Sequence, residues 1–139
     1  MNLIVKIKLI TFFMFVAFHA FANNNIKTLQ LSKSSILTGI ITHVRDGDTI
    51  IIGAIPIRLA ALNCPEKDTE KGKYATEIAV QFVGEIANCE LTGAKTYDRF
   101  VGYCSINGND FGQFMMQNSS CKVWKKFDIM KKILELYNI

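Results

Sequence analysis

Carboxylates and arginines are the side chains best suited to carry chemistry in this chain. Between residues 46 and 66 the sequence holds Asp46, Asp48 and Glu66 together with Arg58. Carboxylate oxygens are preferred ligands of hard divalent cations such as Ca²⁺. The planar guanidinium fork binds a phosphate group bidentately, which the lysine ammonium does not do. The stretch therefore predicts a site for a divalent cation and a phosphate group.

The scarcity of arginine and histidine narrows the chemistry further. The only arginines are Arg45, Arg58 and Arg99, and each lies in or beside a candidate motif. Ordinary surface ion pairing, which stabilises little, is the alternative role for them. His43 is the only histidine after residue 22, and no Gly-x-Ser-x-Gly motif is present. A histidine-rich metal site is therefore excluded, a serine–histidine nucleophilic centre is disfavoured, and we expect His43 to be structural or at the surface.

Hydrophobic patterning predicts the elements that must position these residues. Runs rich in Ile, Val and Thr indicate strands, and apolar residues at three- and four-residue spacing indicate helices. The predicted strands are 36–45, 49–52, 55–62, 89–92 and 100–106, and the predicted helices are 75–86, a short one over 111–115 capped by Asp110, and 127–137. This order is typical of a β-rich α+β domain, a five-stranded Greek-key barrel of the oligonucleotide-binding type (OB-fold) with an inserted helix and short C-terminal helices.

The predicted turn at Gly53-Ala54 fixes the register of one hairpin. With this turn at its centre, Asp48 lies opposite Leu59, one residue from Arg58. A metal-binding carboxylate and a phosphate-binding guanidinium would then be close neighbours.

An ordered set of short motifs resembles the staphylococcal nuclease (thermonuclease-like) family. The motifs are Asp46-Gly47-Asp48-Thr49, Arg58-Leu59, Pro65-Glu66 and Asp98-Arg99, and the similarity runs from about Gly39 to Met116. The resemblance implies an OB-fold barrel and Ca²⁺-dependent hydrolysis of phosphodiester bonds in DNA and RNA.

The resemblance also implies roles for individual residues in the reaction. Glu66 matches the glutamate that orients the attacking water. Arg58 and Arg99 match the two arginines that hold the scissile phosphate and stabilise the transition state. Tyr97 matches a tyrosine near the phosphate of the nucleotide.

The metal site implied by the resemblance departs from the family pattern. Asp48 matches a direct Ca²⁺ ligand, Cys64 offers only its backbone carbonyl, and Asp46 is expected in the outer shell. Asn63 stands where the family has a second ligating aspartate, so one negative charge is lost and we expect weaker binding of Ca²⁺.

Further departures lie later in the chain. Asp98 replaces a glycine and places a carboxylate beside Arg99, and Ser119-Ser120-Cys121 replaces Gly-x-Ala. The longer C-terminal helix of the family is not recognisable from Lys125 onward.

The first residues resemble an export signal. Lys6 and Lys8 precede an apolar run, and Ala20-Phe21-Ala22 forms a small-x-small cleavage site. Without residues 1–22 the net charge falls from +4 to +2, which permits nucleic-acid binding without arguing for it. We expect a signal peptide over 1–22, a flexible segment over 23–35, a staphylococcal nuclease-like domain over 36–127, and a short helix or degenerate tail over 128–139. The expected product is a monomeric periplasmic or secreted protein without stable membrane association.

Four cysteines follow the cleavage site. An even number in an oxidising compartment indicates disulfides, although four buried thiols are the alternative. Cys89 and Cys104 fall on adjacent predicted strands, which favours that pair and leaves Cys64 with Cys121. The sequence alone allows three connectivities.

Three functions remain open at this point. The first is a nuclease acting on DNA, RNA or both. The second is a catalytically weak or inactive OB-fold module that binds nucleic acid, and the third is a disulfide-stabilised structural domain. The set of Asp48, Arg58, Glu66 and Arg99 favours the first, because a carboxylate such as Glu66 beside a phosphate would repel the ligand of a pure binder.

Overall fold

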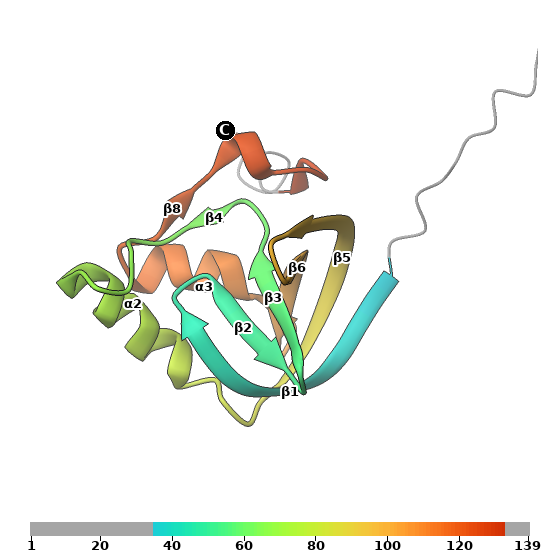
Figure 1. The fold of residues 1–139 in the computed structure, drawn as a ribbon, viewed down its shortest axis with the longest axis horizontal. Helices are drawn as coiled ribbons and strands as arrows, with labels where there is room; N and C mark the ends of the chain where they lie inside the picture. The colour runs from blue at the N-terminus through green and yellow to red at the C-terminus, as the bar shows by residue number, and fades with distance from the viewer. Residues whose placement is uncertain (1–34, 133–139) are drawn as a thin grey trace, which may run out of the picture. The chain divides into compact units, whose positions relative to one another are not determined.

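The computed structural model describes residues 35–132, which form a β-rich α+β fold (Figure 1). The predicted signal peptide, the segment over 23–34 and residues 133–139 lie outside the described residues. The elements in chain order are β1 (Ser35–Asp46), β2 (Thr49–Ile52), β3 (Ile55–Leu59), β4 (Leu62–Asn63), α2 (Glu70–Val80), β5 (Ile86–Thr96), β6 (Arg99–Ile106), β7 (Asn109–Asp110), α3 (Phe111–Asn118), β8 (Lys122–Val123) and the 3₁₀ turn η1 (Lys125–Phe127).

The main sheet is six-stranded and mostly antiparallel, in the order β3-β2-β1-β5-β6-β7. A parallel pairing of β3 with β6 joins the two sides, so the pairings of β1, β2, β3, β6 and β5 form a closed ring. β1 takes part twice, because its first half pairs with β5 and its second half with β2. Register shifts around His43 accompany the sharp curve of this strand (Figure 1). The small β4–β8 pair forms a separate sheet.

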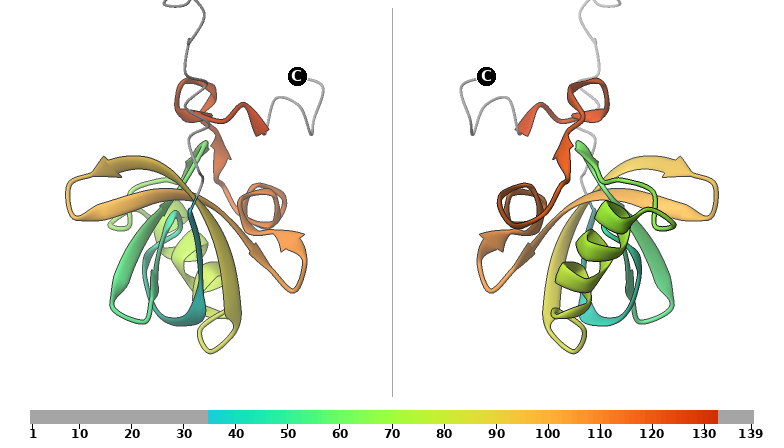
Figure 2. Two further views of the ribbon diagram at one scale, coloured as in Figure 1. Left: turned by 90° about the vertical axis from the view of Figure 1, so that its right-hand side faces the viewer. Right: turned by 90° about the vertical axis from the view of Figure 1, so that its left-hand side faces the viewer.

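The core lies inside this ring of strands. Its largest fully buried side chains include Ile41, Ile50, Ile57, Phe111 and Met115. Helix α2 packs beside the curved strands, and α3 follows the β6–β7 hairpin (Figures 1 and 2). The rings of Phe111 and Phe114 in α3 contact Phe82 at centroid distances of 4.9 Å each, which joins α3 to the turn that follows α2.

Backbone conformation explains where the predicted boundaries were wrong. The third strand ends at Leu59 rather than residue 62, because Ala61 has a φ of 54° that a strand cannot contain. Helix α2 spans Glu70–Val80 rather than 75–86, and Gly84 at φ 97° turns the chain into β5. β5 is longer than predicted, and its register shift between Leu91 and Lys95 carries it on to Thr96. Asp110 caps α3 as predicted, because its Oδ1 accepts a hydrogen bond of 2.7 Å from the Gln113 amide.

The helix predicted over 127–137 does not form over residues 127–131. The turn η1 ends at Phe127, and Lys131 has a φ of 54°, which an α-helix does not accommodate, so helical conformation begins only at Lys132. This segment instead packs against β6 through Asp128, whose buried carboxyl accepts a hydrogen bond from the Tyr103 hydroxyl. The Met130 amide donates to the same hydroxyl at 3.1 Å. Within residues 35–132, no helix has the length and apolar character needed to cross a membrane.

Candidate functional site

The β2–β3 hairpin brings the first two site residues together. Thr49 pairs with Arg58, and the Leu59 amide donates to the Asp48 carbonyl at 2.8 Å, as the turn at Gly53-Ala54 predicted. The side chains meet as well, because Arg58 Nη2 lies 3.0 Å from Asp48 Oδ2. Both side chains are largely buried, with exposed fractions of 12% for Arg58 and 11% for Asp48. The hairpin therefore places a guanidinium against a carboxylate at the edge of the ring of strands.

Arg99 joins this pair from a different part of the sheet. It begins β6, and its Nη1 donates to Thr49 Oγ1 at 3.0 Å. The Thr49 hydroxyl in turn lies 3.2 Å from Asp48 Oδ1. The pKa of Arg58 is lowered, first by its burial and also by repulsion from Arg99, although Asp48 opposes this shift. Two guanidinium groups are therefore held close together, with one carboxylate to balance them.

The electrostatic environment of Asp48 is unusual for a carboxylate. Burial and, to a smaller extent, the neighbouring Asp46 charge raise its pKa to about 6 against the attraction of Arg58. The Cys64 amide donates to Asp48 Oδ2 at 3.2 Å, and the Asp48 amide donates to Asp46 Oδ1 at 3.1 Å. A cation bound here would balance the negative charges of Asp48 and Asp46, and the desolvation of Asp48 strengthens its attraction for such a cation.

Close packing holds the Asp46–Asp48 turn against the segment that carries Cys64. A side chain on Gly47 would meet the Cβ atom of Ala75 in α2 at 2.8 Å and the Cys64 sulfur at 3.1 Å. Only glycine therefore allows the turn to approach this closely. Cys64 is itself tied to Cys121 by a disulfide.

The segment with Asn63 and Glu66 is braced from two sides. Asn63 pairs with Lys122 in the β4–β8 sheet. The Glu66 carbonyl accepts hydrogen bonds from the Thr69 amide at 3.0 Å and the Thr69 hydroxyl at 2.7 Å, at the start of α2. Gly72 lies against this carbonyl, where a side chain would come within 1.9 Å of its oxygen. The backbone of Glu66 is thus fixed, while its side chain is exposed.

The residues at this edge offer a cation oxygen donors. These are the carboxylates of Asp46 and Asp48 and, in the adjoining segment, the Asn63 amide and the Cys64 carbonyl. No group of three or more His, Cys, Asp or Glu residues suited to a metal is found among residues 35–132. An all-oxygen set of this kind suits Ca²⁺.

Tyr97 stands at the tip of the β5–β6 hairpin. It is 96% exposed, has a φ of 56°, and its ring centroid lies 6.0 Å from the Arg99 guanidinium carbon. This distance is at the outer limit of a cation–π contact.

A cavity of about 450 Å³ adjoins the two arginines. Arg58, Arg99 and Tyr97 line it together with Trp124 and Phe127, whose rings meet at a centroid distance of 4.2 Å. No role for Thr49 or for these two aromatic residues was predicted from the sequence. The position of Thr49 directly after Asp48 could have indicated its role from the sequence. The placement of Trp124 and Phe127 could not be predicted, because it depends on how the chain after β8 packs.

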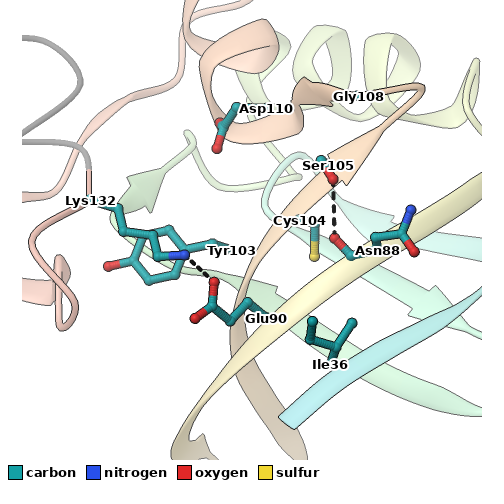
Figure 3. A pocket seen from close by; sticks show the side chains of 9 residues that line it. All are labelled: Ile36, Asn88, Glu90, Tyr103, Cys104, Ser105, Gly108, Asp110 and Lys132. Carbon is teal, nitrogen blue, oxygen red and sulfur yellow. Dashed lines mark hydrogen bonds and ion pairs between the residues drawn. The ribbon is translucent and has the colours of Figure 1, made fainter. Parts of the chain in front are cut away.

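A second cavity, of about 350 Å³, shares no lining residue with the first. Figure 3 shows Lys132 and Glu90 paired at one side of it, with Tyr103 and Asp110 nearby. Its residues come from cross-strand neighbours such as Asn88 and Ser105, and it lacks an arginine. The guanidinium groups of Arg58 and Arg99 therefore lie at the first cavity.

Both disulfides follow the connectivity that the strand arrangement favoured. Cys89 pairs with Cys104 directly across β5 and β6, and Cys64 pairs with Cys121. None of the described cysteines is free. Two disulfides indicate an oxidising compartment.

Comparison with known proteins adds no assignment. A scan against protein-family models finds no match, and a search of curated proteins finds no significantly similar protein. The function must therefore be argued from the geometry of the site.

Proposed function

We propose that this protein is an exported, metal-dependent nuclease of the staphylococcal nuclease type, built on an OB-fold. The observation that carries the proposal is the convergence of Arg58 from β3, Arg99 from β6 and Asp48 from the turn before β2, joined through the Thr49 hydroxyl. The closed ring of strand pairings, with a helix between β3 and β5, supports the OB-fold.

The two arginines suit a phosphodiester with a developing negative charge. Arg58 is desolvated, so its attraction for an anion is screened less than in water. Arg58 Nη1 is anchored on the Leu59 carbonyl at 2.9 Å and Arg99 Nη1 on Thr49, so both groups are oriented before substrate arrives. Preorganised donors of this kind stabilise a transition state without reorganisation.

Asp48, Asn63 and the Cys64 carbonyl would hold the metal, proposed to be Ca²⁺, with Asp46 outside the direct ligands. When bound, the ion would polarise the phosphoryl oxygen. Asp48 would keep the ion next to Arg58, so the phosphate would meet positive charge from both. Glu66 would orient the attacking water and accept its proton, because its exposed carboxylate stands on a fixed backbone close enough to Arg58 to affect its pKa. Tyr97 would contact the nucleotide near its phosphate.

The disulfides support the proposed destination, the periplasm or the medium. Export by the predicted signal peptide would deliver the chain there, and nucleic acid would be its substrate.

The test is cleavage of DNA and RNA by the protein with Ca²⁺ and with a chelator. We expect cleavage only with the ion. Glu66→Ala should lower kcat by about 10²–10⁴-fold and Arg58→Ala by about 10²–10³-fold, because a general base and a charge-stabilising donor are lost. Glu77→Ala is the matched control, since it removes an exposed carboxylate of α2 outside the site.

Two results would contradict the proposal. Absence of metal-dependent cleavage by the unaltered protein, with retained binding of an oligonucleotide, would favour the binding module. Cleavage that Glu66→Ala leaves as fast as Glu77→Ala would disprove the role given to Glu66.

A further inference from the structure

The tip of the β5–β6 hairpin carries Tyr97 and Asp98, directly before Arg99. Only these two residues turn the chain. Tyr97 adopts a φ of 56°, and this left-handed conformation is energetically unfavourable for any residue other than glycine. The ladder between β5 and β6 is also interrupted between Leu91 and Lys95. A hairpin end of this kind requires contacts from elsewhere to hold Arg99 in one place.

Such a contact comes from Arg45 at the end of β1. Its Nη1 donates to Asp98 Oδ1 at 3.1 Å and its Nη2 to Asp98 Oδ2 at 2.8 Å. This is the two-point arrangement that fixes orientation as well as distance. The two residues are 53 positions apart, and Arg45 directly precedes Asp46 of the candidate metal site. The pair therefore links the tip of the hairpin to the turn that carries Asp46 and Asp48.

We propose that the Arg45–Asp98 ion pair positions Arg99 over the scissile phosphate, a role that rests on the proposed nuclease function. The Arg99 side chain also donates a hydrogen bond to the Thr49 hydroxyl. The connection between β1 and β2 therefore contacts the β5–β6 hairpin at two points, through Arg45 to Asp98 and through Thr49 to Arg99. Both Arg45 and Asp98 are positioning residues, because neither needs to touch the substrate.

The ion pair also reduces the repulsion that the Asp98 carboxylate would exert on a phosphate group. A free carboxylate at Asp98 would stand beside Arg99 and repel an incoming phosphate. Arg45 binds this carboxylate and lowers its pKa, first through its hydrogen bonds, whereas Arg99 makes the smallest of the contributions. The positive charge of Arg99 is thus left for the substrate.

This double role predicts unequal effects for the two partners. Asp98→Asn frees the hairpin without leaving an unpaired carboxylate, so we expect kcat to fall about three- to five-fold with little change in KM. Arg45→Gln should lower kcat by the same factor and also raise KM, because Asp98 then competes with phosphate for Arg99. The double variant Arg45→Gln/Asp98→Asn should recover the KM of the unaltered protein and keep the kcat of Asp98→Asn.

A second measurement does not depend on activity. NMR signals of the Tyr97 amide and the Arg99 Nε–H group should broaden or shift in all three variants. Lys132→Gln is the control, since it removes a partly buried ion pair with Glu90 that lies at the second cavity, and it should leave kcat, KM and both signals unchanged.

The outcomes separate the two proposals. If the unaltered protein does not cleave nucleic acid, the nuclease function fails, and the positioning role fails with it even if the NMR signals respond to Arg45→Gln. If the unaltered protein cleaves, positioning is overturned by unchanged kcat in Asp98→Asn, by unchanged NMR signals, or by a KM in the double variant as high as in Arg45→Gln.

Discussion

The two disulfides close chain loops of very different size, so their removal should have different costs. Cys64–Cys121 spans 57 residues and Cys89–Cys104 spans 15. The loop-closure relation for a denatured chain at 25 °C converts these separations to about 4 and about 3 kcal/mol of stability, respectively. Cys64→Ala/Cys121→Ala should therefore lower the free energy of unfolding by about 1 kcal/mol more than Cys89→Ala/Cys104→Ala.

The position of each disulfide in the fold predicts a further difference between the two variants, in their cleavage activity. Cys64 lies in the segment that carries Asn63 and Glu66, and its amide donates to Asp48. Cys89 and Cys104 face each other within a continuous strand ladder, which would hold them in register without the bridge. At a temperature where both variants are folded, the Cys64/Cys121 variant should lose most of its metal-dependent cleavage and the Cys89/Cys104 variant little.

Urea denaturation followed by the fluorescence of Trp124, the single tryptophan, measures both stabilities. Cleavage rates are then compared at equal fractions of folded protein. The reasoning would be refuted if the Cys89/Cys104 variant were the less stable of the two. Equal loss of activity in the two folded variants would refute the link between the Cys64–Cys121 bridge and the site.

Three further predictions follow from single contacts. Tyr103→Phe removes a hydrogen bond to the buried Asp128 carboxyl and should lower the free energy of unfolding by about 1–3 kcal/mol, while Tyr74→Phe on the exposed face of α2 should have no effect in the same urea titration. In chelator, Asp48 with its pKa of about 6 binds protons more strongly in the folded than in the unfolded chain, so the free energy of unfolding should fall as pH rises from about 4 to about 6. Asp48→Asn should abolish this pH dependence, and an identical dependence in the variant would contradict the assignment to Asp48. Asn63→Asp should tighten Ca²⁺ binding on the order of tenfold by calorimetry, because it restores a carboxylate, and unchanged affinity would remove Asn63 from the ligand set.

Local sequence was sufficient for the hairpin that forms half of the site. Gly53-Ala54 supplies the turn, with Gly53 at φ 61°, and the alternating residues on either side then set the register that pairs Thr49 with Arg58. The cap of α3 at Asp110 was equally local, because it needs only a carboxyl before a helical run. Strand ends and the start of the C-terminal helix were misjudged, since periodicity does not report the positive φ angles of Ala61 and Lys131.

The sequence by itself determined which residues could hold a cation and a phosphate. It also determined that histidine offers almost no alternative ligands for a metal. Tertiary structure decided which of them meet. Arg99 reaches Thr49 only because β6 pairs with β3 across a gap of some forty residues, and Asp98 turns to Arg45 rather than to Arg99. These contacts depend on the closure of the strand ring, which couples segments far apart in the chain. No local pattern encodes such a coupling, so the electrostatic balance of the site became visible only in the folded protein.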